Sequence, residues 1–95
     1  MIKVIKKQDK KLTDREIMSL LKRDVEKFNE YRNKYNLDRD IFDGLYLKNI
    51  NIANTNLSNL YLGAVEFINC NCSYTNFENA EFDNAMLEDC NFDNK

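Results

Sequence analysis

Apolar side chains recur every five residues through the second half of the chain. Read in fives from Asp40, residues 40–94 make eleven units without an insertion, and the third residue of every unit is apolar. These third residues are Phe42, Leu47, Ile52, Leu57, Leu62, Phe67, Cys72, Phe77, Phe82, Leu87 and Phe92. A period of five fits neither an α-helix, which repeats after 3.6 residues, nor a continuous strand, which repeats after two.

The other positions of each unit explain this period. The first residue is small or apolar in ten of the eleven units, the second is mostly Asn, Glu or Tyr, and the fifth is Asn in seven. An inward, outward, inward order predicts a three-residue strand, and two further residues must then turn the chain. Asn tolerates the left-handed backbone that suits such a corner. The pattern therefore predicts a coil that winds around its own apolar axis, with successive coils stacked into one core.

These units resemble the pentapeptide-repeat family, whose motif is A-(D/N)-L-X-X, and AEFDN, AMLED and TNLSN are close matches. The resemblance implies a mainly β fold over residues 40–94, a right-handed quadrilateral β-helix with four units per coil. Residues twenty apart should then stack, with Phe42, Leu62 and Phe82 in one column. Fifty-five residues make about 2.75 coils, a tower only some 13 Å tall at about 4.8 Å per strand. The segment before the repeats also looks like the helix-to-repeat junction of some bacterial members.

Residues 1–39 have a different pattern, that of one amphipathic helix. Apolar residues from Ile17 onward follow one another at intervals of three and four, which predicts a helix over about residues 13–35. Thr13 and Glu16 have the spacing of a capping box at its start. Because a solenoid needs protection at its ends, we expect this helix to cap the first coil. The packing residues would be Phe28, Tyr31 and Tyr35. Residues 2–5, IKVI, are a candidate short strand.

The charge divides between the two segments, with a net +5 over residues 1–39 and a net −7 over residues 40–95. The basic residues of the predicted helix alternate with acidic ones, which is typical of a solvated face, so no nucleic-acid or membrane partner is expected. The start of the chain is too short and too polar for a signal peptide, and no stretch approaches a membrane span. We therefore expect a cytoplasmic protein with reduced cysteines.

The chain offers little for catalysis. It has no His, which removes imidazole acid–base chemistry and Cys/His zinc sites. Cys70 and Cys90 should lie in one column near Cys72, and buried apolar thiols are the favoured interpretation, although stacked strands would also permit a disulfide. Six carboxylates are expected on the outside, as an acidic surface rather than a catalytic pair: Glu78, Glu81, Asp83, Glu88, Asp89 and Asp93. No catalytic residue, metal site or cofactor is predicted, and the chain is not expected to be an enzyme.

Two functions remain open. Nothing after Asn94 can cover the last coil, so its edge, with Met86, Leu87, Cys90 and Phe92, should be open to pairing. The favoured function is a non-catalytic interaction or scaffold module that forms a homodimer there or binds an unknown protein partner. The alternative is a DNA mimic, since some family members resemble duplex DNA and protect gyrase. A dimer of about 26 Å would, however, fall short of one duplex turn of about 34 Å.

Overall fold

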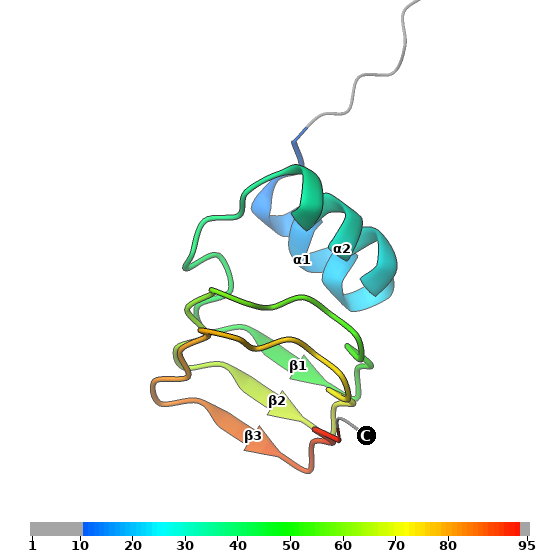
Figure 1. Cartoon of the computed structure of the whole chain (residues 1–95). Coiled ribbons are helices and arrows are strands. Elements are labelled where there is room, and N and C mark those ends of the chain that lie inside the picture. The colour runs from blue at the N-terminus through cyan, green and yellow to red at the C-terminus, as the bar shows by residue number, and fades with distance from the viewer. Residues whose placement is uncertain (1–10, 94–95) are drawn as a thin grey trace, which may run out of the picture.

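Parallel pairing between residues twenty apart organises the second half of the chain. The computed structural model describes residues 11–93, so the candidate strand at residues 2–5 lies outside the described part. Three strands, β1 (Tyr46–Lys48), β2 (Glu66–Ile68) and β3 (Met86–Glu88), form a parallel sheet in the order β1-β2-β3. Figure 1 shows these strands stacked one below the other, each reached by a turn of the chain around the molecule.

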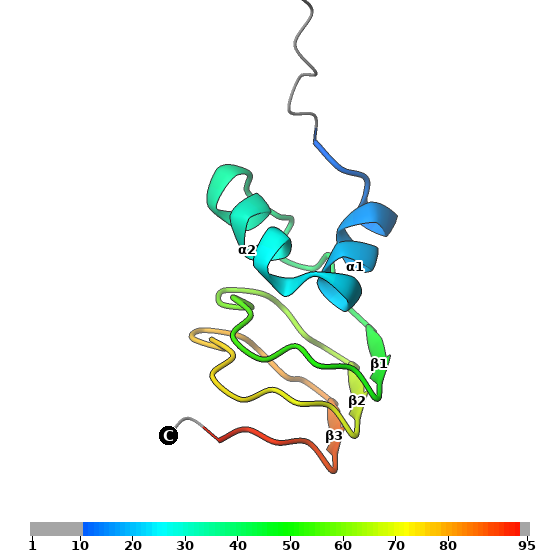
Figure 2. The same cartoon turned by 90° about the vertical axis from the view of Figure 1, so that its right-hand side faces the viewer.

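The same register continues around the other sides of the coil. Parallel bridges join Asn51 to Asn71, Asn71 to Asn91, and Asn56 to Asn76. Backbone hydrogen bonds link each coil to the next, as from the N–H of Ile52 to the C=O of Asn71 at 2.9 Å. The predicted stacking at intervals of four units is therefore confirmed, and the stacked turns in Figure 2 form a β-helix solenoid.

The corners explain why Asn is so frequent at the fifth position. Every fifth residue from Asn49 to Asp89 has a positive φ, between 52° and 63°, and Gly44 at the first corner has a φ of 73°. Two of these corner amides also bond along the stack, since Asn69 Nδ2 donates to Asn49 Oδ1 at 2.8 Å and Asn79 repeats the contact with Asn59 at 3.1 Å. Asn is thus suited both to the left-handed backbone and to the ladder of corners.

The core follows the third and first positions of the repeat. Phe42, Leu47, Ile52, Leu57, Leu62, Phe67 and Cys72 are all nearly or fully buried. Buried first-position residues, among them Leu45 and Val65, lie beside them. The apolar column along the axis is therefore continuous through the first two coils.

The prediction of one helix over residues 13–35 was wrong, because the segment forms two. α1 spans Asp14–Arg23 and α2 spans Val25–Lys34. Asp24 has an extended backbone, with φ −154° and ψ 86°, and its side chain accepts the N–H of Lys27 at 3.1 Å. Asp24 thus caps the start of α2. The predicted capping box of Thr13 and Glu16 is present at the start of α1.

The break at Asp24 lets both short helices lie over the same end of the solenoid (Figure 2). The side chains of Ile17, Leu20 and Leu21 in α1 are buried in the common core. Phe28 in α2 is fully buried, and its ring lies 5.9 Å from the ring of Phe42. A straight helix of about 22 residues would be about 33 Å long, too long to remain over one coil.

Candidate functional site

The inward positions become exposed in the last coil. In the column of Leu47, Phe67 and Leu87, the exposed fractions are 0%, 0% and 38%. In the neighbouring column, Cys72 is 1% exposed and Phe92 is 40% exposed. We call the apolar inward residues of the last coil the C-terminal end face; they are Phe77, Ala80, Phe82, Ala85, Leu87, Cys90 and Phe92.

Aromatic contacts hold this face together across the solenoid axis. The ring of Phe77 lies 5.2 Å from that of Phe82, in an edge-on arrangement, and 6.0 Å from that of Phe92. Cys90 is half-buried beside them, and its Sγ lies 3.2 Å from the C=O of Phe67 in the coil above. The end face is thus a packed apolar surface and not a set of loose side chains.

The backbone of the last coil also presents an open sheet edge. In the upper coils the N–H of the third residue of a unit donates to a C=O of the following coil, as the N–H of Leu62 does to the C=O of Glu81 at 2.7 Å. The C=O of the first residue accepts an N–H of the following coil, as the C=O of Leu60 does from the N–H of Glu81 at 3.1 Å. By the same register, the N–H of Phe82 and the C=O of Ala85 point away from the coil above. Such a row of donors and acceptors is a template for pairing with another chain.

Met86 lies on a different surface from the other three predicted edge residues. It is 50% exposed, and it pairs with Glu66, which in turn pairs with Tyr46, on the outward side of the β1-β2-β3 sheet. Its neighbour Leu87 alternates inward. Met86 therefore belongs to the side wall of the solenoid, while Leu87, Cys90 and Phe92 belong to the end face.

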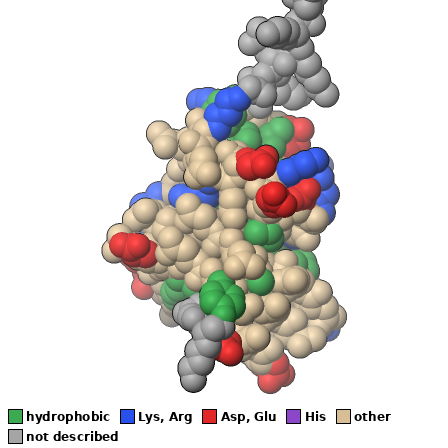
Figure 3. All heavy atoms as spheres, turned by 45° about the vertical axis from the view of Figure 1, so that its right-hand side comes forward, with side chains coloured by type: hydrophobic (Ala, Val, Ile, Leu, Met, Phe, Trp, Pro, Cys, Tyr) green, Lys and Arg blue, Asp and Glu red, His purple; other side chains and the backbone are tan. Residues whose placement is uncertain are grey.

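The predicted acidic surface surrounds this end of the molecule. The six carboxylates Glu78, Glu81, Asp83, Glu88, Asp89 and Asp93 are all exposed. Glu81 pairs with Arg39 at 2.6 Å. In Figure 3 red side chains lie at the lower end of the molecule, whereas most blue side chains lie toward the helices, with red ones among them. The carboxylates are spread around the rim and do not converge on a cleft.

Comparison with known proteins identifies the repeat. Residues 61–94 match the model of the family described as Pentapeptide repeats (8 copies). Within residues 61–94 the repeats are those of the pentapeptide-repeat family. No curated protein matches the chain, and no solved structure matches it. The resemblance inferred from the five-residue units is confirmed.

The pentapeptide-repeat coils meet the helix pair through residues that were predicted and others that were not. Phe28 packs against Phe42, as described above, while Tyr31 is half-buried and its hydroxyl accepts the N–H of Leu12 at 2.9 Å. Tyr35 stacks on Tyr31 with ring centroids 4.8 Å apart. Phe28 thus contacts the first coil directly, Tyr31 packs against the core as a partly buried residue, and Tyr35 is the residue that caps the end of α2.

Two polar residues of α2, Asn29 and Arg32, were missed by the sequence analysis. Asn29 bonds the backbone at Asn54 and Asn56, and Arg32 donates to the C=O of Asn56 at 2.8 Å. Burial lowers the pKa of Arg32. No spacing marks these positions, because a polar residue on the rim of an apolar stripe looks like any solvated one.

The three thiols of the pentapeptide-repeat solenoid are free. Burial raises the pKa of Cys72 to about 12 and also raises the pKa of Cys70, so both are neutral at physiological pH. Across residues 11–93, no group of three or more Cys, Asp or Glu side chains is arranged to hold a metal ion. In the same part of the chain neither helix is long and apolar enough to cross a membrane.

Proposed function

We propose that this chain is a non-catalytic protein-interaction module that self-associates through the C-terminal end face. In this proposal the repeat is a right-handed quadrilateral β-helix of about 2.75 coils, and α1 and α2 cap its first coil. The supporting observation is the exposure of Leu87 and Phe92, at 38% and 40%, in columns that are buried one coil earlier. Pentapeptide-repeat proteins are generally non-enzymatic, which agrees with a binding role.

The energy available at the end face favours a weak dimer. A Phe side chain covers about 150–250 Å², so burying the exposed part of Phe92 is worth about 1.5–2.5 kcal/mol at about 25 cal/mol per Å². Leu87 contributes a similar amount, and two copies together give about 6–10 kcal/mol. Association itself costs about 4–15 kcal/mol, so the open backbone edges must supply the remainder. We therefore expect a dimer that dissociates in the micromolar range or above.

The acidic rim opposes this dimer and makes it sensitive to salt. Two carboxylates about 10 Å apart across the interface repel by about 0.4 kcal/mol in water, and salt reduces this repulsion over a Debye length of about 8–10 Å. At physiological salt each such pair retains roughly 0.1 kcal/mol, so several pairs together oppose the dimer by less than about 1 kcal/mol. Raising the ionic strength should therefore strengthen self-association. It should weaken the binding of a basic protein partner to the acidic rim, because salt screens that attraction.

The mass of the protein in solution, measured by sedimentation over a range of concentrations, tests the proposal. We expect the wild type to form a dimer at high concentration and Phe92→Glu to remain a monomer. Tyr46→Glu is the matched control, because Tyr46 is 49% exposed but lies in the first coil, far from the end face. A wild-type mass that stays monomeric throughout, or a dimer that Phe92→Glu leaves intact, would refute self-association at this face.

The DNA-mimic alternative rests on the acidic rim alone. Its six carboxylates are spread around the corners, and the predicted height of the repeat remains well below one turn of duplex. A gyrase supercoiling assay with added protein would test it directly, and inhibition or protection there would favour the mimic over the interaction module.

A further inference from the structure

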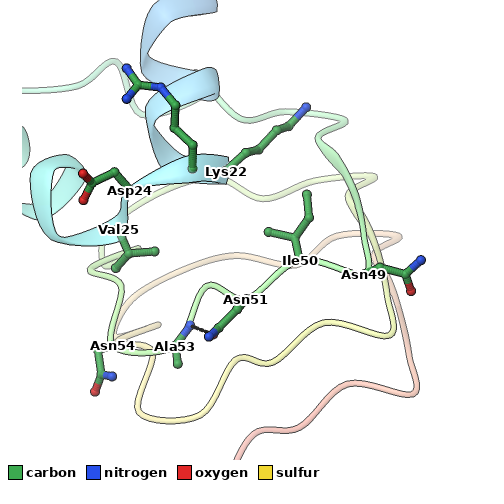
Figure 4. Close-up of a pocket in the computed structure, with 9 residues that line it drawn as sticks. Lys22, Asp24, Val25, Asn49, Ile50, Asn51, Ala53 and Asn54 are labelled. Atoms are coloured by element: carbon green, nitrogen blue, oxygen red, sulfur yellow. Dashed lines mark hydrogen bonds between the residues drawn. The ribbon is translucent and has the colours of Figure 1, made fainter.

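A second open edge lies at the opposite end of the solenoid, beside the helix pair. A groove of about 540 Å³ separates the junction of α1 and α2 from one side of the first coil. Figure 4 shows this groove, which is lined by Lys22, Arg23, Asp24, Val25 and, from the first coil, Asn49, Ile50, Asn51, Ala53 and Asn54.

The backbone of the first coil is closed on one side by a substitute for a preceding coil. The N–H of Asn56, the second residue of the fourth unit, donates to Asn29 Oδ1 at 2.8 Å. Asn51 occupies the same second position in its unit, but nothing within residues 11–93 accepts its N–H. Its own side chain instead accepts the N–H of Ala53 at 2.9 Å (Figure 4).

The carbonyl of Asn51 faces the same opening. In the next coil the second-position C=O of Asn71 accepts from the coil above, from the N–H of Ile52 at 2.9 Å. By this register the C=O of Asn51 points toward the groove, next to its N–H. One residue therefore offers a donor and an acceptor together, which is the pair that an added β-strand uses.

The walls of the groove determine what kind of strand fits. Val25 from α2 and Ile50 from the coil are both half-buried and provide apolar contact. Lys22 and Arg23 are exposed above them, and neither forms an ion pair within the described part of the chain. Asp24, the one carboxylate among the lining residues, accepts the N–H of Lys27 as the cap of α2. The groove thus combines an apolar floor, a strand edge and a surplus of positive charge.

We propose that this groove binds an extended acidic peptide segment of a partner protein by strand addition at Asn51. Acidic side chains of the peptide contact Lys22 and Arg23, and the apolar side chains between them cover Ile50. A phosphate or another small anion is a poorer fit, because it would meet the carbonyl of Asn51 as well as its N–H, and two acceptors repel. This site is distinct from the C-terminal end face, so either can fail without the other.

The test uses the full chain labelled with ¹⁵N and an acetylated, amidated octapeptide of alternating Glu and Val. We expect the amide resonances of Asn51 and Ala53 to shift, with a dissociation constant on the order of 0.1–1 mM, since one backbone pair and exposed charges provide the affinity. Lys22→Glu should weaken binding by about tenfold. Lys27→Glu is the matched control, because it makes the same charge change on an exposed helical residue outside the groove.

Two further peptides separate strand addition from attraction by charge. Methylating the backbone nitrogens of the Val residues should abolish the shifts, whereas a Lys and Val peptide of the same length should not bind. The proposal is overturned if no shift appears at about 5 mM peptide, a concentration above the expected dissociation constant. It is also overturned if the methylated peptide or inorganic phosphate causes the same shifts, which would indicate a simple anion site.

Discussion

One side chain of α2 closes the upper edge of the first coil, and its removal tests how the helices stabilise the repeat. Asn29 Nδ2 donates to the C=O of Asn54 at 2.8 Å, and Asn29 Oδ1 accepts the N–H of Asn56 at 2.8 Å. A single amide therefore supplies the acceptor that a preceding coil would provide for Asn56, and it also donates to the carbonyl at the corner residue Asn54. Asn29→Ala removes both hydrogen bonds without touching the apolar contact of Phe28.

The expected loss follows from these two bonds. Each contributes about 1 kcal/mol net, and Asn29 is only half-buried, so water can replace part of the interaction. Ala is a better helix former than Asn by about 0.5 kcal/mol, which offsets some of the loss. We expect Asn29→Ala to lower the free energy of unfolding by about 1.5 kcal/mol, or the melting temperature by about 6–12 °C.

Asn33→Ala is the matched control, because Asn33 is exposed on the same helix and its side chain forms no hydrogen bond within residues 11–93. It should stabilise the protein slightly, by about 0.5 kcal/mol, through helix propensity alone. Urea unfolding followed by circular dichroism measures both variants. If Asn29→Ala and Asn33→Ala agree within about 0.3 kcal/mol, the edge closure contributes nothing and the reasoning fails.

Asn29→Asp adds a dependence on pH. The carboxylate still accepts the N–H of Asn56 but cannot donate to the C=O of Asn54, and its charge lies beside that carbonyl oxygen. At pH 7 this variant should be less stable than Asn29→Ala. Below about pH 4 the protonated carboxyl regains a donor, so its deficit relative to the wild type should shrink. A deficit that is constant with pH would contradict this interpretation.

Three further outcomes are expected from urea unfolding. Ala64→Asn should stabilise the protein by about 1 kcal/mol, because Ala64 has a φ of 54° and an amide there could bond to Asn84 in the same column. An unchanged urea midpoint would show that this corner is not strained. Phe67→Ala should lower the free energy of unfolding by about 3–5 kcal/mol, since Phe67 is fully buried. Phe82→Ala should lower it by less, because Phe82 is only half-buried at the end face, and equal losses would contradict this reasoning. The pKa of Cys72 is raised to about 12, so its thiol stays neutral in the folded state, whereas the thiol of the unfolded chain ionises near pH 9. The free energy of unfolding should therefore fall between about pH 9 and 12, by up to about 1.4 kcal/mol per pH unit. Cys72→Ala should remove that part of the slope, and an identical slope would show that Cys72 does not cause it.

The start of the helical segment and the corners of the repeat could be predicted because their causes are local. The capping box needs only Thr13 and Glu16, three residues apart, and it is present. The positive φ at the fifth positions follows from the need to turn within two residues, and Asn marks most of these corners. Asp24, with Glu26 in the first turn that follows, was a local signal for a second helix start. The apolar stripe hid it, because the stripe continues on the same face across the break.

The five-residue period of the sequence, together with the four units per coil that the family resemblance implies, determined the stacking of the solenoid. A five-residue period with four units per coil leaves one register in which every third residue faces the axis, and Phe67 between Leu47 and Leu87 is its direct consequence. Only the tertiary structure decided how the ends differ. Asn29 closes the coil at Asn56, and the groove leaves it open at Asn51, because the angle at which two short helices cross a finished coil depends on their packing and not on any repeat.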